Sequence, residues 1–141
     1  MMVGSSERLY DMGLHETIIA LQTSVRTVQG IKYAPEVLVD SAQQFPFAIS
    51  YPRVGTIEIN AGWTKKLSTI FLEVHCSKSL TEKILLESVP YLEKIAAILQ
   101  NNPTLNGTIS NITDIKWEFG KMTYATIETI GYRFEIGIKD L

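Results

Sequence analysis

The sequence predicts an α+β fold: a mainly antiparallel sheet of about four to six strands, with two helices packed on one face. Two segments repeat apolar residues at spacings of three and four, which is typical of amphipathic helices. Several others alternate apolar with polar residues, which is typical of half-buried strands. With 141 residues, 45% of them hydrophobic, the chain can bury a core without disulfides. We therefore expect residues 1–141 to form one domain, with residues 1–12 either fraying or extending the first helix.

The first helix is predicted from one apolar stripe, formed by Leu14, Ile18, Leu21, Val25 and Val28. Gly30 is expected to end it. Residues 31–44 show no clear period around Pro35, so we expect an irregular excursion there, with one brief strand at residues 37–39.

Three strands are predicted next. Phe47, Ile49 and Tyr51 alternate with smaller residues, and Pro52 and Gly55 are expected to close this strand before a second one at residues 57–59. The Ala61-Gly62 turn then precedes a third strand, whose core face is expected to carry Ile70, Leu72, Val74 and Cys76. Its polar face would carry Thr69, Phe71, Glu73 and His75.

The second helix is predicted to begin at a capping box, Ser79 to Glu82, in which each side chain satisfies a free backbone amide. Pro90 predicts a kink or a restart near Ser88, because proline lacks the amide donor. Pro103 is expected to end the helix just after Asn101 and Asn102. The stripe expected to face the core is Leu85, Val89, Leu92, Ala96 and Leu99.

The last third is predicted to be β-rich. A strand is expected at residues 109–119, followed by a turn at Gly120-Lys121. Residues 124–138 would supply the rest of the sheet, with a possible break at Gly131. The alternation of Tyr132, Phe134, Ile136 and Ile138 with polar or small residues is the cleanest strand pattern in the chain.

Composition excludes several classes of protein. The net charge is −2 and the basic residues are spread along the chain, so we expect no tight binding of nucleic acid by a monomer. The apolar runs are too short to cross a bilayer, so we expect no membrane partner and a soluble protein. One cysteine, Cys76, excludes an intrachain disulfide, and the N-terminus does not resemble a secretory signal. A reducing cytoplasm is the expected place of folding.

No catalytic or metal-binding pattern stands out. His15 and His75 lack the spacing of a zinc site, and we expect His75 to be a surface residue beside a buried, inert Cys76 thiol. The acidic residues of the predicted strands are expected to lie on solvated faces and not to form an acid–base pair: Glu58, Glu73, Glu118, Glu128 and Glu135. We therefore expect no enzyme, no metal site and no cofactor.

Three aromatic residues remain unexplained, because Phe71, Trp63 and Trp117 fall at positions that are predicted to be exposed to solvent. Exposed aromatic patches usually mark contacts between proteins. A second small core under residues 31–44 would explain them equally well, so both interpretations stay open.

Short stretches in a fixed order resemble the tail terminator or minor tail protein family of long-tailed bacteriophages. The helix exit Pro103-Thr104-Leu105-Asn106-Gly107 resembles the family's Pro-Thr-Leu-x-Gly. The resemblance covers residues 14–139, and its other parts are the first helix, the proline-entered strand at 45–52, and residues 70–75, 90–95, 119–120 and 131–136.

The resemblance implies a protein that forms a ring, typically a hexamer, on the finished tail tube. Such a ring stops tail polymerisation and offers a docking surface to the head. Its partners would be its own copies, the tail tube protein and a head-completion protein, while DNA passes through the lumen without specific binding. It would lie at the head-proximal end of the virion tail after assembly in the host cytoplasm. The expected contacts to neighbouring subunits or to the tube are Arg53, Trp63, Lys65, Lys66, Phe71 and Trp117.

Two alternatives remain open. One is a head-to-tail connector or another tail-completion subunit with the same core. The other is a small α+β enzyme or ligand-binding domain whose polar groups converge only in three dimensions, in a deep pocket that holds a strongly perturbed acid or base.

Overall fold

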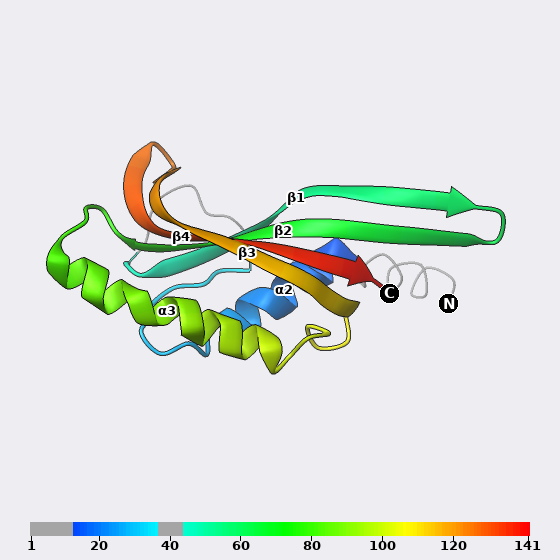
Figure 1. Ribbon diagram of the computed structural model, residues 1–141, viewed down its shortest axis with the longest axis horizontal. Helices are drawn as coiled ribbons and strands as arrows, with labels where there is room; N and C mark the ends of the chain where they lie inside the picture. Colours follow the sequence, from blue (N-terminus) through cyan, green and yellow to red (C-terminus); the bar gives the residue numbers. More distant parts are fainter. Residues whose placement is uncertain (1–12, 37–43) are drawn as a thin grey trace.

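Two long β-hairpins join side by side to form the sheet of this protein (Figure 1). The computed structural model describes residues 13–36 and 44–141, and its antiparallel sheet has the strand order β1-β2-β4-β3. The strands are β1 (Phe47–Asn60), β2 (Trp63–Ser77), β3 (Ile109–Tyr124) and β4 (Ile127–Asp140). Helices α2 (Leu14–Val25) and α3 (Glu82–Gln100) pack on the same face. The predicted α+β class is confirmed.

The main core lies between the helices and this sheet face. The central strands supply it through the register that pairs Ile70 with Ile136 and Leu72 with Phe134, so that these side chains point the same way. All four are buried, together with Leu21 and Val25 of α2 and Ile95 and Leu99 of α3.

Helix α2 confirms the stripe predicted for it, although it ends at Val25, ahead of Gly30. A residue outside that stripe ties the helix to the sheet. The Gln22 amide, fully buried, donates to the carbonyl oxygens of Ala48 (3.0 Å) and Pro35 (2.7 Å), and it accepts a hydrogen bond from Ser50 Oγ at 2.5 Å. Residues 35, 48 and 50 are thereby fixed against one side of the helix.

Helix α3 differs from the prediction at its start. Thr81 caps the helix by accepting from the Ile84 amide at 3.2 Å, so the capping box predicted from Ser79 is wrong. The helix also runs as one element through Pro90, so no restart occurs near Ser88. It ends at Gln100 with Asn101 as its cap, as predicted.

The buried face of α3 is rotated from the predicted stripe. Ser88, Tyr91, Ile95 and Leu99 face the core. Leu85 and Val89, which were predicted to be buried, are exposed. Apolar residues occupy more than one face of this helix, so periodicity alone could not choose between two overlapping stripes.

Strand β1 passes through Pro52 and Gly55, so the prediction that they close a strand is wrong. The register with β2 shifts between Pro52 and Val54, and β1 is an edge strand. Both features let proline sit in a sheet, because its missing amide would otherwise break a ladder bond. The hairpin turns instead at Ala61-Gly62, where Gly62 has a φ of 91°.

The outer part of this hairpin projects beyond the rest of the sheet, as Figure 1 shows. Pairing between β2 and β4 ends at Leu67 and Lys139, so residues 57–66 pair only with each other, while residues 54–56 pair with residues 67–69 at the edge of the four-stranded sheet. We call residues 53–66 the arm.

The second hairpin is also longer than predicted. Strand β3 continues past Gly120 to Tyr124, and the turn lies at Ala125 and Thr126, whose φ angles of 49° and 72° are both positive. The predicted turn at Gly120-Lys121 is therefore wrong. Strand β4 runs unbroken through Gly131. The predicted strand at 37–39 and the expectation for residues 1–12 lie outside the described residues.

A glycine pair across this hairpin offers a matched test of packing. A Cβ at Gly131 would lie 1.9 Å from the carbonyl oxygen of Val74, whereas a Cβ at its partner Gly120 would meet nothing within 4 Å. We expect Gly131→Ala to lower the free energy of unfolding by about 1–3 kcal/mol, the usual cost of overpacking. Gly120→Ala should change it by less than about 0.5 kcal/mol. Urea unfolding of both variants measures the difference, and equal stabilities would refute the close approach.

Candidate functional site

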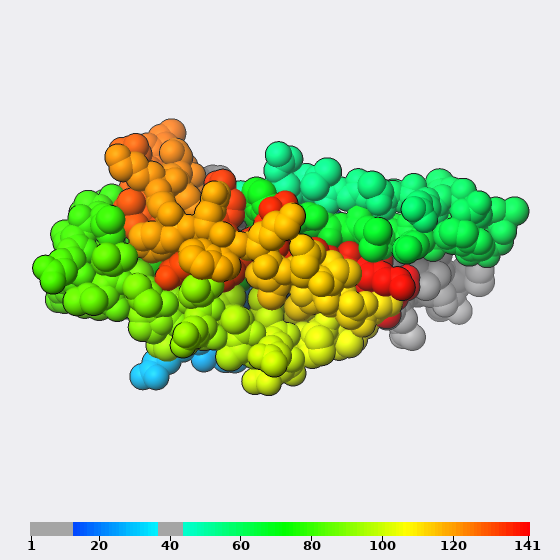
Figure 2. All heavy atoms as spheres, viewed as in Figure 1, coloured from blue at the N-terminus to red at the C-terminus, as the bar shows by residue number. Residues whose placement is uncertain are grey.

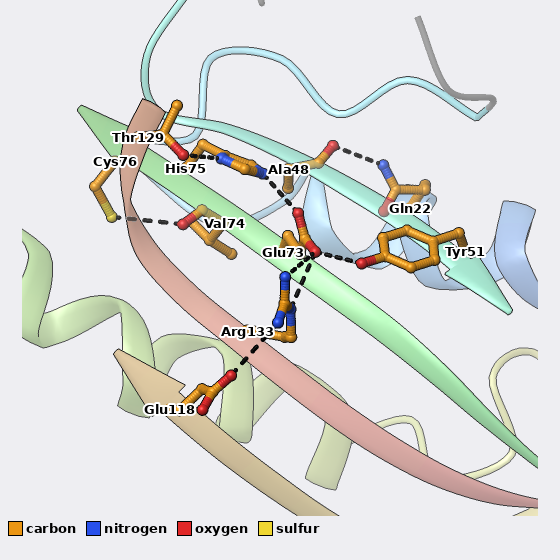
Figure 3. Close-up of polar contacts among 10 residues, drawn as sticks. All are labelled: Gln22, Ala48, Tyr51, Glu73, Val74, His75, Cys76, Glu118, Thr129 and Arg133. Carbon is orange, nitrogen blue, oxygen red and sulfur yellow. Dashed lines mark hydrogen bonds and ion pairs between the residues drawn. The ribbon is translucent and has the colours of Figure 1, made fainter. Parts of the chain in front are cut away.

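The sheet face opposite the helices carries a buried polar network that joins three strands (Figure 3). Glu73 of β2 lies at its centre, paired in register with Arg133 of β4. Tyr51 comes from β1, His75 from β2 and Thr129 from β4. Glu73 is 3% exposed and His75 is 0% exposed. The predictions of a solvated Glu73 and a surface His75 are therefore wrong.

Both oxygens of the Glu73 carboxylate accept hydrogen bonds. His75 Nε2 lies 2.9 Å from Oε1 and must carry the proton, because a carboxylate can only accept. Arg133 Nε donates to Oε2 at 3.1 Å, and the Tyr51 hydroxyl donates to the same oxygen. Thr129 Oγ1 lies 2.5 Å from His75 Nδ1, and Arg133 Nη1 also reaches Glu118 at 3.5 Å.

Aromatic rings keep water from the network. The Phe47 ring stacks on His75 with centroids 4.7 Å apart and an angle of 8°, and Tyr124 contacts both rings. Phe47, Ile49 and Tyr124 are buried together, with Tyr33 and Phe45 packed against them. A second small core therefore exists on this face, over the base of β1.

The electrostatics follow from this enclosure. Burial alone would raise the pKa of the Glu73 carboxyl, but hydrogen bonds from His75 and Tyr51 and the charge of Arg133 lower the pKa below its ordinary value. Burial and the contact with Glu73 raise the pKa of Tyr51 to about 12. The network therefore holds a stable carboxylate, and no side-chain polar atom buried within the described ranges lacks a hydrogen-bond partner.

The network consequently suits a structural role. It links β1, β2 and β4 within the sheet, about 20 Å along β2 from the point where the arm begins. Its acid and imidazole are hydrogen-bonded to each other. Cys76 is buried as predicted, and burial raises the pKa of its thiol, which favours the unreactive form. Among residues 13–36 and 44–141, no cluster of three metal-ligating side chains occurs.

The six predicted contact residues fall into two groups. Arg53, Trp63, Lys65 and Lys66 all lie on the arm, and all are exposed. Phe71 and Trp117 instead line one open hollow of about 230 Å³, together with Lys116, Glu118, Arg133 and Glu135.

Phe71 is covered partly from within the chain. Its ring packs edge-on against Tyr51 at 5.7 Å, and the guanidinium groups of Arg53 and Arg133 lie 5.7 and 5.3 Å from its centre. Trp117 packs against Tyr132 at 6.0 Å but stays half exposed.

Sequence reasoning predicted Trp63 as an exposed contact but missed the other exposed apolar side chains of two surfaces. The arm patch consists of Ile57 and Ile59 on one face of the hairpin and Val54 and Trp63 on the other, and Ile59 is 76% exposed. The helix patch consists of Leu80, Leu85, Leu86 and Val89, at and before the first turns of α3, and Leu86 is 67% exposed. The signal for the helix patch was the excess of apolar residues in α3, beyond what one buried stripe needs.

The network makes a prediction for acid stability. Because the folded-state pKa of Glu73 is lowered, the carboxylate stabilises the fold above the unfolded-state pKa of roughly 4.3. This stabilisation is lost as the pH falls through the folded value. Glu73→Gln should lower the free energy of unfolding at pH 7 by about 2–3 kcal/mol and flatten its decline in acid. Denaturant unfolding from pH 7 to pH 3 measures both effects.

Glu118→Gln is the matched control, because Glu118 also contacts Arg133 but is largely exposed. It should cost less than about 1 kcal/mol at pH 7. Equal losses in the two variants would contradict a central role for the buried carboxylate.

Comparison with family models and with curated proteins identifies no relative of this chain. No family model matches the chain, and no curated protein matches it. None of the helices in the described part is long and apolar enough to span a membrane.

Proposed function

We propose that this protein is a virion structural protein that caps a phage tail tube as a ring of its own copies. The ring would end tail polymerisation and provide the surface on which the head docks. This proposal combines the resemblance in sequence with the shape of the molecule, and it assigns no chemical reaction to the chain.

The observation that carries the proposal is the arm. A two-stranded hairpin without a third strand or a helix to cover it is marginally stable in water. This arm nevertheless exposes Ile57, Ile59 and Trp63, all more than half exposed. Exposed apolar surface of this kind favours a contact with another protein, because burial in an interface would remove it from water. A role in assembly explains why the chain keeps this exposed apolar surface although its contact with water is unfavourable.

The buried network supports the same reading. A projecting arm positions its tip only if the sheet that carries it is rigid, and Glu73 joins β1, β2 and β4 within that sheet through Tyr51, His75 and Arg133. The acid and the histidine are enclosed and bonded to each other, which suits bracing better than proton transfer to a substrate.

The charge of the chain suits a ring through which DNA passes. A net charge of −2 is compatible with an acidic or neutral lining, which would not compete for phosphates and would let DNA move without being held. A cationic lining would bind the DNA phosphates and retain the DNA.

The direct test is the length of tail tubes. Co-expression with the tail tube protein of the same phage should give tubes capped at one end and shorter than tubes made without this chain, as measured by electron microscopy. Trp63→Asp should restore uncapped growth, because a charge would be placed in the apolar contact. Ala97→Asp, which places the same charge at an exposed position of α3 away from the arm, should still cap.

Thermal unfolding of both variants is the control for folding, since neither side chain is part of a core. Tubes whose length does not depend on the wild-type chain would refute the proposal.

A further inference from the structure

The two outer strands of the sheet, β1 and β3, each present a free edge. In Figure 2 the arm, in teal, runs uncovered along the upper side, and β3, in yellow and orange, crosses the front of the molecule. Among residues 13–36 and 44–141, no segment outside the sheet forms backbone hydrogen bonds with residues 54–60 of β1 or residues 114–120 of β3. Free edges of this kind are templates for pairing with another chain.

The topology of the sheet lets one copy continue the sheet of the next. All neighbouring strands are antiparallel and their order is β1-β2-β4-β3, so β1 and β3 run in opposite directions. When copies are related by rotation about an axis along the strands, β3 of one copy therefore meets β1 of the next copy in an antiparallel arrangement. This contact joins two different edges, so it is head-to-tail. A closed ring of such contacts leaves no free edge.

Exposed apolar side chains lie on the same sheet face at both edges. Ile57 is paired with Lys66, which shares the helix-bearing face of β2 with the buried Ile70. Trp117 is paired with Phe134, which is buried on that same face. Ile57 and Trp117 are both more than half exposed. Pairing of the two edges would therefore bring apolar side chains together on one face.

One register also matches the charges of the two edges. If Ile57 lies opposite Trp117, then Glu58 lies opposite Lys116, and both charged side chains point to the face away from the helices. Glu58 and Lys116 are exposed, and neither forms an ion pair with the described residues. In the same register Ile59 lies opposite Ile115. Aromatic, β-branched and opposite-charge pairs are the pairs that stabilise antiparallel strands.

The neighbouring registers are unfavourable. A shift of two residues in one direction or the other would put Glu58 opposite Asp114 or Glu118, and like charges directly opposite each other are destabilising. A shift of one residue would put the apolar side chains of the two strands on opposite faces. The side chains of the two edges thus select a single pairing.

We infer that residues 54–60 of one copy pair antiparallel with residues 114–120 of the next, with Ile57 opposite Trp117 and Glu58 opposite Lys116. Backbone hydrogen bonds hold the two edges together, and the side chains set the register. This inference rests on the proposed ring and identifies the contact that builds it.

Exchanging the two charges tests the register. Glu58→Lys or Lys116→Glu alone places like charges opposite each other, and should raise the concentration needed for half-assembly at least about tenfold. The double variant Glu58→Lys/Lys116→Glu restores opposite charges at every contact and should assemble nearly as the wild type does. Sedimentation velocity measures assembly, and thermal unfolding checks that the exposed substitutions leave the fold intact. Equal assembly of all four proteins, or a double variant no better than the single ones, overturns the inference.

Disulfide trapping tests the same contact directly. Thr56→Cys and Glu118→Cys place thiols at exposed positions that lie opposite each other in this register, while the native Cys76 is buried. Each variant alone should remain largely uncrosslinked under mild oxidation, whereas the mixture should give a covalent dimer on a non-reducing gel. Thr56→Cys mixed with Lys121→Cys is the matched control, because Lys121 is exposed on the same strand but on its other face. This pair should give little dimer.

The double variant Thr56→Cys/Glu118→Cys separates the inference from the proposed function. A ladder of crosslinked products that stops at one covalent ring supports both. A ladder without an upper limit supports the contact but overturns the ring. If electron microscopy shows rings while the mixture crosslinks no better than the control pair, the inference is overturned and the ring stands. Absence of both crosslinks and rings overturns both.

Discussion

The buried carboxylate of Glu73 is the constraint on which the rest of the structure depends. It lies on the sheet face away from the helices, where water would normally solvate it, and a buried charge is tolerated only when it is paired and fully hydrogen-bonded. His75, Tyr51 and Arg133 meet that need from three strands. The same bonds hold these strands together within the four-stranded sheet, and β1 and β2 continue from there into the arm. Pairing this one charge therefore also joins the two strands of the arm to β4.

The joined strands determine how the arm, the exposed part of the molecule, is held. A hairpin that pairs only with itself would flex about its root, but this one continues two strands of a four-stranded sheet. Its apolar tip is therefore carried at a defined distance and direction from the helices. The free edge of β3 gives each copy a second, different surface, which is the geometry that a head-to-tail assembly needs.

The sequence predicted the fold class and much of the main core, because strict periodicity is a strong signal where one face is buried. It located the stripe of α2, the core face of β2 and the end of α3. It failed where local signals competed with tertiary structure. Pro52 and Gly120 were taken as breaks, yet an edge position with a register shift accommodates the first, and pairing with Gly131 of β4 carries the strand through the second.

The polar network could not be predicted for a related reason. Glu73 and His75 alternate with apolar neighbours as solvated residues do, and nothing local reveals that Phe47 and Tyr124 cover them from distant parts of the chain. Four of the residues predicted as contacts, Arg53, Trp63, Lys65 and Lys66, lie together on the arm. The helix patch was missed because Leu85 and Val89 were assigned to the core.

The central claim is that this protein works by presenting shaped surfaces to copies of itself. Native mass spectrometry of the wild-type chain over a range of concentrations tests it most directly. The account predicts a discrete closed species of about six subunits that grows at the expense of monomer. A chain that stays monomeric at every concentration would contradict it.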